Sequence, residues 1–217
     1  MKWFLLGVVL SLFGSLPQWG SAEVIINEFS AASSDRVLRR IPGKNPSVGA
    51  TVSWQEAEYD DSRWRSGSGP FAYWSAGDVP GFTDLSGLMY GRATSVYLRK
   101  SFVVSALDAT SEASLQLTIR YRHGFIAFLN GIEVARRSMG PPGMFAFRDH
   151  TAFNFNTNNQ AETIELGVSS NLLVAGENIF CIQAHALSIT GDVLVDADLQ
   201  IADGSMLITS DSEWRYF

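Results

Sequence analysis

Hydrophobic and polar positions alternate along much of the chain, and this pattern predicts β-strands rather than helices. The clearest case is Ser114 to Tyr121 (SLQLTIRY), in which Leu115, Leu117 and Ile119 share one face and polar side chains share the other. Successive side chains of a strand point to opposite sides of a sheet. We therefore expect this segment to be a strand with one face in the core.

The segment from Tyr121 to Arg136 (YRHGFIAFLNGIEVAR) carries two alternating patterns joined by Asn130-Gly131. An Asn-Gly pair tolerates the positive φ angles that a two-residue type I′ turn requires. The sequence therefore predicts a tight antiparallel hairpin here.

Further strand patterns recur at short intervals, separated by turn residues such as Gly176-Glu177-Asn178 and Gly191-Asp192. In Val96 to Val104 (VYLRKSFVV), Lys100 falls among apolar positions, which places it near a sheet edge. Many short strands and almost no amphipathic helix predict an all-β fold, a β-sandwich or jelly roll whose two inner faces form the core. The other predicted strands are Glu23 to Phe29, Thr51 to Trp54, Ser68 to Trp74, Thr163 to Leu166, Asn178 to Leu187 and Asp192 to Ile201.

One long segment, Gly140 to Gln160, has no sustained period and is rich in Gly, Pro, Asn and Phe, so it is predicted to be a loop. Loops of this length in a compact domain are often functional. Its large apolar side chains either pack down onto the core, which the cost of exposing them favours, or present an aromatic surface. These side chains are Met144, Phe145, Phe147, Phe153 and Phe155.

The chain begins with the order expected of a secretory signal peptide: Lys2, an apolar run from Trp3 to Phe13, and Gly20-Ser21-Ala22. That run is too short for a membrane-spanning helix, and no later segment is long enough either. We expect a secreted protein, extracellular or at the cell surface. The predicted organisation is a signal peptide (1–22), an N-terminal strand and linker (23–49), a β-sandwich domain (50–203) and a C-terminal strand (204–217).

The C-terminal segment from Ser205 to Phe217 (SMLITSDSEWRYF) ends in apolar and aromatic residues. Two interpretations stay open. It either begins a further module of a longer protein, or it folds back into the sandwich in place of a first strand. An unpaired aromatic strand would be an exposed edge.

The net charge and the cysteine content of the chain limit its possible partners and its possible disulfides. The chain has 16 Lys and Arg against 22 Asp and Glu, a net charge of −6, which argues against nucleic acid as a partner. Cys181 is the single cysteine, so no intrachain disulfide can form. It lies in an apolar strand pattern and is expected to be a buried, inert thiol.

Four motifs follow one another along the chain: YDDSRW (Tyr59 to Trp64), SVYLRKSFVV (Ser95 to Val104), LQLTIRYRHGFIAFLNGIEVARRSM (Leu115 to Met139) and GENIFCIQAHA (Gly176 to Ala186). Together and in this order they resemble the galactose-binding-like jelly-roll β-sandwich, an accessory domain in secreted modular bacterial proteins and in glycoside hydrolases similar to β-galactosidases. The opening VIINEFSAAS (Val24 to Ser33) also resembles the start of a lamin-tail-like domain. The resemblance implies a sugar-binding module, with polysaccharide or glycan as its ligand and other modules of the same polypeptide or surface proteins as neighbours.

A sugar site needs exposed aromatic rings beside polar groups that fix hydroxyls. Tyr73 and Trp74 are adjacent, so they point to opposite faces of a strand and one of them is expected to look outward. As core residues they would need no ligand, and that alternative stays open. The candidate ligand-binding residues are Tyr73, Trp74, Tyr90, Arg92, Phe147 and His150.

The sequence offers no catalytic constellation, and we expect no enzyme activity and no cofactor. Asp60 or Asp61 is expected to cap a turn that holds Trp64 against the sandwich. The three histidines lie far apart without a zinc-ligand spacing. The acidic residues Asp192, Asp196, Asp198 and Asp203 lack the spacing of a calcium loop and are interpreted as a solvated face, with calcium as an open alternative.

These observations predict a secreted, non-catalytic binding or spacer module with carbohydrate as its ligand. Two alternatives remain: a fragment of a carbohydrate-active hydrolase, and a purely structural cell-surface or adhesion module.

Overall fold

The computed structural model describes residues 52–73, 82–156 and 160–217. The signal peptide, the N-terminal strand and linker, and Trp74 lie outside the described residues and stay predictions. The described elements, helices included, belong to the unit from Lys44 to Phe217. The strands are β1 (Arg65–Ser68), β2 (Phe71–Tyr73), β3 (Thr83–Asp84), β4 (Ser95–Val104), β5 (Ser114–Tyr121), β6 (Gly124–Leu129), β7 (Ile132–Arg137), β8 (Glu162–Val168), β9 (Gly176–His185), β10 (Val193–Ile201), β11 (Met206–Ile208) and β12 (Glu213–Tyr216). The helical turns are α2 (Ser86–Met89), η1 (Asp108–Thr110) and η2 (Ser169–Asn171).

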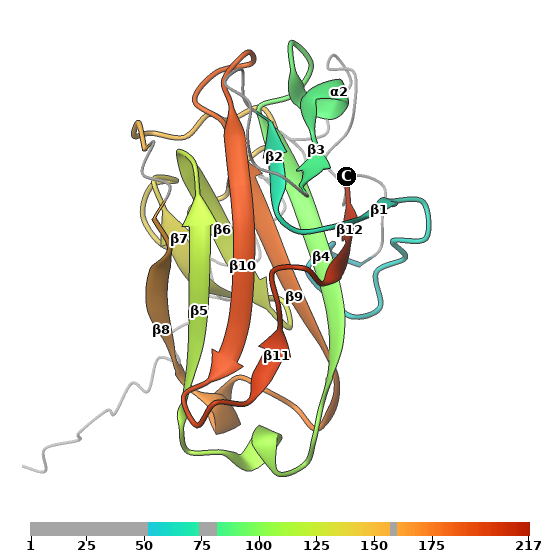
Figure 1. Ribbon diagram of the computed structural model, residues 1–217, viewed down its shortest axis with the longest axis vertical. Helices are drawn as coiled ribbons and strands as arrows, with labels where there is room; N and C mark the ends of the chain where they lie inside the picture. Colours follow the sequence, from blue (N-terminus) through green and yellow to red (C-terminus); the bar gives the residue numbers. More distant parts are fainter. Residues whose placement is uncertain (1–51, 74–81, 157–159) are drawn as a thin grey trace, which may run out of the picture. The chain divides into compact units, whose positions relative to one another are not determined.

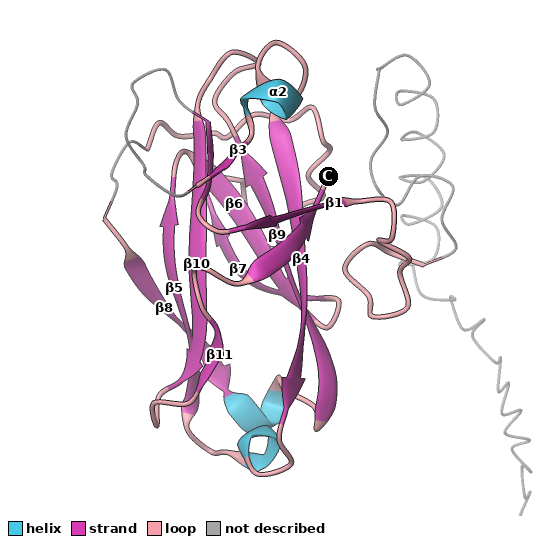
Figure 2. Cartoon of the chain, turned by 45° about the vertical axis from the view of Figure 1, so that its right-hand side comes forward, coloured by secondary structure: helices cyan, strands magenta, loops and turns pink. Residues whose placement is uncertain are grey.

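The strands form two stacked sheets, so the predicted all-β sandwich is confirmed. Sheet A has the order β1-β12-β4-β9-β6-β7, and sheet B has the order β3-β2-β10-β5-β8, with β11 also paired to β10. In Figure 1, β10 and β5 of sheet B lie in front of β9 and β6 of sheet A. Figure 2 shows the two layers side by side, with η1 and η2 at the lower end.

The core lies between the sheets and follows the period-two pattern of the sequence. Leu115, Leu117 and Ile119 of β5 are fully buried, as predicted. They pack in one apolar cluster with Phe180 of β9 and Val195 of β10. Burial of this continuous apolar layer is the main source of stability, because hydrophobic stabilisation scales with the apolar area removed from water.

The predicted hairpin is confirmed from Gly124 onward. β6 and β7 pair antiparallel around Asn130 (φ 50°) and Gly131 (φ 83°), which both adopt the positive φ that a type I′ turn needs. Tyr121 instead ends β5, and the chain crosses from sheet B to sheet A through Arg122 and His123. The alternation continues across this crossing, so the pattern alone does not show it.

Two other boundaries differ from the prediction. Residues 52–54 do not form a strand, and Trp54 instead packs edge-to-face with Tyr97 and Phe128 of sheet A. The predicted strand from Ser68 onward is divided: β1 ends at Ser68 in sheet A, and β2 begins at Phe71 in sheet B. Gly69-Pro70 lies between them, and proline cannot donate to a strand ladder.

The C-terminal segment folds back into the sandwich, since β12 lies between β1 and β4. Trp214 and Tyr216 enter the core. β12 pairs with Leu98 and Arg99 of β4, and Phe217 and Tyr97 exchange main-chain hydrogen bonds, but no pairing reaches Lys100. Lys100 therefore lies where β4 loses this neighbour, in agreement with the predicted edge.

Candidate ligand-binding surface

The outer face of sheet A, opposite the core, is covered in part by two segments without strands. Residues 52–64 cover one part, where Trp54 and Trp64 pack on Tyr97, Ile179 and Cys181. Residues 138–156 of the long loop cover the other part. The outward side chains between Ser95 and Arg99 of β4 and between Ile179 and His185 of β9 are therefore buried, although several of them are polar.

Polar side chains of sheet A hold the main chain of the long loop. Gln183 Nε2 donates to the Ala146 carbonyl at 3.1 Å, and Ser95 Oγ donates to the Arg148 carbonyl at 2.7 Å. His185 Nδ1 donates to the carbonyl of His150 at 2.8 Å. A buried donor without a partner would cost about 1–3 kcal/mol, so these bonds fix the position of the loop.

A second anchor comes from β7. Arg136 donates to the carbonyls of Met139 (2.6 Å) and Met144 (2.8 Å) while forming an ion pair with Glu133 at 2.8 Å. The hydrogen bond from Arg136 lowers the pKa of Glu133, so this carboxylate stays charged. Gly140, at a φ of 81°, completes the turn, and a methyl group there would meet Met144 and Phe153.

Small residues face inward and phenylalanines face outward along this loop. Ala146 and Ala152 are buried against Ile126 and Met139. In contrast, three phenylalanine side chains are more than half exposed. These are Phe145 (54%), Phe153 (57%) and Phe155 (71%).

We call Phe145, Phe147, Phe153 and Phe155 the phenylalanine surface. Phe145 and Phe147 pack edge-to-face at 4.7 Å between ring centroids. Phe147 in turn contacts the His150 ring at 5.0 Å, and Phe155 lies 5.5 Å from the ring of His123. The expectation that these aromatics pack down on the core is therefore wrong for the three exposed rings: alanines and main-chain carbonyls anchor the loop, and the rings are left outside.

The sequence-predicted binding residues fall into two groups, and no described contact joins them. Phe147 and His150 belong to the long loop, where His150 Nδ1 accepts a hydrogen bond from the Phe147 amide at 3.4 Å. Tyr73 and Tyr90 pack together at 5.5 Å, with Tyr90 56% exposed. Arg92 lies near the second group but donates to the Gly87 carbonyl, which fixes its own turn.

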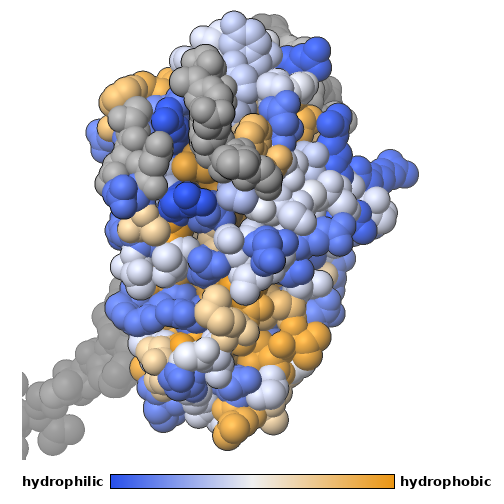
Figure 3. Space-filling view, in the orientation of Figure 1, coloured by the Kyte–Doolittle hydropathy of each residue, from blue (hydrophilic) through white to orange (hydrophobic). Residues whose placement is uncertain are grey.

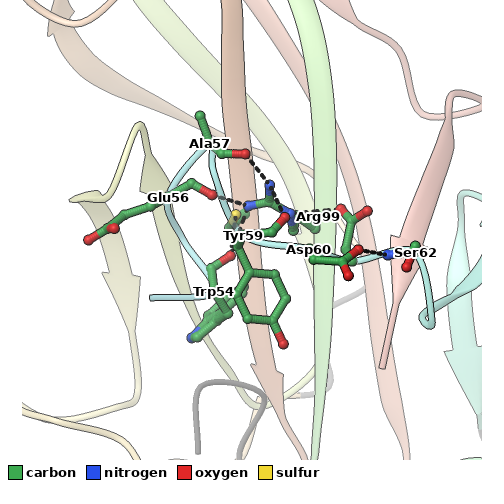
Figure 4. Close-up of polar contacts among 9 residues, drawn as sticks. Trp54, Glu56, Ala57, Tyr59, Asp60, Ser62 and Arg99 are labelled. Atoms are coloured by element: carbon green, nitrogen blue, oxygen red, sulfur yellow. Dashed lines mark hydrogen bonds and ion pairs between the residues drawn. The ribbon is translucent and has the colours of Figure 1, made fainter. Parts of the chain in front are cut away.

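The other cover of sheet A depends on Arg99, which is 3% exposed in β4 (Figure 4). Its Nε donates to Asp61 at 2.7 Å, and its two terminal nitrogens donate to four main-chain carbonyls. All five N–H donors of the guanidinium are used, which is the condition under which a buried cation is tolerated. The four carbonyls are those of Trp54 (2.9 Å), Glu56 (2.8 Å), Ala57 (3.3 Å) and Tyr59 (3.4 Å).

Asp60 caps the turn as predicted, since its Oδ1 accepts a hydrogen bond from the Ser62 amide at 3.0 Å (Figure 4). Cys181 lies beneath this cover, fully buried, with Sγ 3.9 Å from the Trp54 carbonyl. Burial raises the pKa of Cys181 to about 12, so the thiol is inert while the segment stays in place.

The acidic residues proposed as a solvated face each have a protein partner. Asp192 pairs with Arg122 and with His123 Nε2 (2.9 Å). Asp196 pairs with Arg120, and Asp198 accepts the Ser210 amide at 2.7 Å. Among the described residues, no group of three or more His, Cys, Asp or Glu side chains is arranged to hold a metal ion.

Figure 3 shows the sheet B side of the molecule, where polar residues cover most of the middle and apolar residues gather at the lower end. The exposed apolar residues of the strands and turn that end there include Val103, Leu107 and Met206. None of the described helices has the length and apolar composition of a membrane span.

No protein-family profile and no curated protein sequence matches the chain. Among solved structures, an α-L-rhamnosidase from Streptomyces avermitilis in complex with L-rhamnose is 14% identical over 68% of this chain and 12% of its own, with a TM-score of 0.38. An α-L-rhamnosidase from Aspergillus terreus is 21% identical over 57% of this chain and 14% of its own (TM-score 0.36). A β-glucuronidase from Ruminococcus gnavus is 12% identical over 62% of this chain and 21% of its own (TM-score 0.31). This chain thus spans a small part of each enzyme, and at these TM-scores their activities are not transferred to it.

Proposed function

We propose that this chain is a secreted, non-catalytic binding module that holds a glycan on the phenylalanine surface. The observation that carries the proposal is the combination of a fixed main chain with exposed rings. Exposing three phenylalanines of one loop costs free energy that a compact fold avoids, and exposed apolar groups concentrated on one loop favour a role in binding. The rings here stand on a loop whose carbonyls are held by buried side chains, so binding need not order the loop.

A glycan fits this surface because the C–H faces of a sugar ring are apolar while its hydroxyls need polar partners. His150 touches the Phe147 ring, and Asp149 is exposed beside it. The edge-to-face pair of Phe145 and Phe147 offers two ring orientations within one contact. The resemblance of the sequence to galactose-binding-like domains supports the same ligand class.

Binding of the purified chain to a panel of soluble polysaccharides, followed by calorimetric titration of those retained, tests the proposal. Phe145→Ala and Phe153→Ala should each weaken binding about tenfold, which corresponds to about 1.4 kcal/mol. Leu107→Ala is the matched control, because Leu107 is an even more exposed apolar residue (80%) outside the loop. Surface substitutions of this kind leave stability nearly unchanged.

Two results would contradict the proposal. Equal binding by the parent and both phenylalanine variants would remove the surface as the site. Release of reducing sugar from a bound polysaccharide by the purified chain would overturn the non-catalytic part and favour the hydrolase alternative. Detection of the chain in the culture medium with residues 1–22 removed tests secretion.

A further inference from the structure

Strand β4 has a neighbour along only part of its second edge. On one side, β9 pairs with it over its whole length. On the other side, β12 pairs with Leu98 and Arg99, and the described strands offer no partner beyond Arg99. In Figure 1 the chain before β12 crosses to β11 of sheet B, away from the lower half of β4. We call residues 100–104, on the side that β12 leaves, the β4 edge.

Two residues of the β4 edge offer main-chain groups that have no partner. The Tyr97 amide donates to the Phe217 carbonyl at 3.1 Å, and the Tyr97 carbonyl accepts from the Phe217 amide at 3.0 Å. Every second residue of an antiparallel strand directs its N–H and C=O to the same side, so those of Ser101 and Val103 point the same way as those of Tyr97. Within the described part of the chain, no group donates to or accepts from the main chain of Ser101 and Val103 on this side.

The space beside these groups is open to solvent. Val103 is 80% exposed although it belongs to a strand of sheet A. A cavity of about 300 Å³ lies where β12 leaves β4, and Lys100, Ser101 and Trp214 are part of its lining. An open edge is a template for another strand, and proteins usually close it with a proline, a bulge or a charge. β4 contains no proline and pairs with β9 without a register shift, so neither of the first two devices closes this edge.

The β4 edge is complementary to itself in one antiparallel register. When two copies pair around Phe102, Ser101 lies opposite the partner's Val103, and Val103 lies opposite the partner's Ser101. Every free N–H and C=O group of both edges then has a partner. A register centred on Ser101 would place Val103 opposite Arg99, whose main chain already faces β12. A register centred on Val103 would place Ser101 opposite Ser105, beyond the end of β4.

Lys100, the one charged residue of the β4 edge, is compatible with this register. Its side chain alternates with those of Leu98 and Phe102, which face the core. Like charges directly opposite each other destabilise a strand pair. In the register around Phe102, Lys100 lies opposite the partner's Val104, so the two lysines are not brought together. Residues 101–107 carry no charge, so the paired stretch contains no other repulsion.

We propose that two copies of this chain associate through their β4 edges, antiparallel and about a two-fold axis at Phe102, so that sheet A continues from one copy into the other. A two-fold contact uses the same patch on both copies and is complete in the dimer. Only a short stretch of each strand takes part, so the dimer belongs to the weak, transient class. The two Val103 side chains then lie on one face of the joined sheet, in diagonal positions.

This inference goes beyond the proposed function and does not depend on it. The long loop that carries the phenylalanine surface is held at the other end of β4, where Ser95 donates to the Arg148 carbonyl. Pairing through the β4 edge therefore leaves that surface free on both copies. Two surfaces in one particle raise the avidity for a polymeric ligand.

Sedimentation velocity of the purified chain from about 10 µM to about 1 mM tests the proposal. Val103→Pro removes a donor from the pairing but none from the ladder with β9, because the Val103 N–H points away from β9. Val103→Lys and Val103→Asp keep the main chain and place like charges in the two diagonal positions. Ile189→Lys is the matched control, an exposed apolar residue (49%) beyond the end of β9 that pairs with Ser95. The midpoint of denaturant unfolding reports whether each variant is folded.

We expect the parent and Ile189→Lys to dimerise with the same dissociation constant, and that constant to be at least about tenfold higher in Val103→Pro and in Val103→Lys. If Val103→Pro does not fold, Val103→Lys decides, since its side chain lies in solvent. An equimolar mixture of Val103→Lys and Val103→Asp should dimerise more tightly than either variant alone, because opposite charges then meet across the axis.

Three results would overturn the proposal: a monomer at every concentration, growth beyond the dimer, or a parent-like dissociation constant in Val103→Lys. Phe145→Ala should leave the dissociation constant of the dimer unchanged. Dimerisation and glycan binding therefore succeed or fail separately.

Discussion

Replacing Arg99 by methionine should detach residues 52–62 from sheet A while the sandwich stays folded. Methionine keeps the unbranched stem but removes all five donors, leaving four carbonyls and the Asp61 carboxylate without their partner. Removing one partner of a buried ion pair costs about 3–5 kcal/mol. Asp61 is 29% exposed and the Ala57 and Tyr59 contacts are long, so the lower end of that range applies.

We expect this cost to favour detachment of the segment from sheet A rather than unfolding of the whole domain, because the contacts of Arg99 with 54–61 are made to one surface segment. A loss of about 3 kcal/mol raises the opening constant of that segment more than about a hundredfold. Cys181 reports on this event directly, since it is the only cysteine in the chain and lies fully buried under Trp54. The assay is the rate of native-state thiol labelling, measured beside the midpoint of denaturant unfolding.

We expect the Cys181 thiol to be labelled about a hundredfold faster in Arg99→Met than in the parent. Arg99→Lys should fall between the two, because lysine keeps the charge but loses the planar set of five donors. Arg65→Gln, which changes an exposed arginine on β1, should be labelled at the rate of the parent. Two results would refute the reasoning. The first is parent-like labelling of Arg99→Met. The second is labelling that keeps pace with global unfolding in every variant, which would mean that the segment does not open on its own.

Three further predictions concern the core and the loop. Burial lowers the pKa of His185 to about 4, so the folded state favours the neutral ring. The free energy of unfolding should therefore fall by about 3 kcal/mol between pH 7 and pH 4, because the unfolded state binds a proton below pH 6.5 and the folded state does not until about pH 4. His185→Gln should not lose this part of its stability in denaturant titrations at the two pH values. Gly69→Ala would push a methyl group into the Ser210 carbonyl oxygen and should cost about 1–3 kcal/mol in the same titration, whereas Gly87→Ala, with open space around it, should not destabilise. Leu117→Ala should cost about 2–5 kcal/mol, and a cost below about 1 kcal/mol would contradict the assignment of Leu117 to the core.

The period-two pattern predicted the strands and their inward faces well, because alternation reports directly on burial between two sheets. β5 shows this most clearly: all three of its predicted core residues are fully buried. The pattern could not show that part of the outer face of sheet A is buried as well. Tyr97, Arg99 and Gln183 are polar side chains on that outer face, yet each is nearly inaccessible.

The reason is that their partners are main-chain carbonyls. Arg99 and Gln183 bond to the backbone of 54–59 and to Ala146, and the direction of a carbonyl has no signature in the side chains around it. One signal was present: the nearly continuous apolar run around Cys181 in β9 is typical of a strand covered on both sides. The long loop carried a second signal for this cover. Its alanines, rather than its phenylalanines, are small enough to pack closely against a sheet.

The outer faces of the two sheets therefore differ in what they can do. On sheet B, neighbouring strands satisfy each other's polar groups, as in the Thr118–Thr163 contact at 3.0 Å and the Gln116–Glu165 bond at 2.6 Å. On sheet A, outward side chains instead form hydrogen bonds with the main chain of the covering segments. The side chains of those segments therefore need not alternate between polar and apolar residues as those of a strand do. Substitutions among the outward residues of 138–156 can then change the exposed surface without touching the core, which is why we propose the binding surface on this cover rather than on the strands.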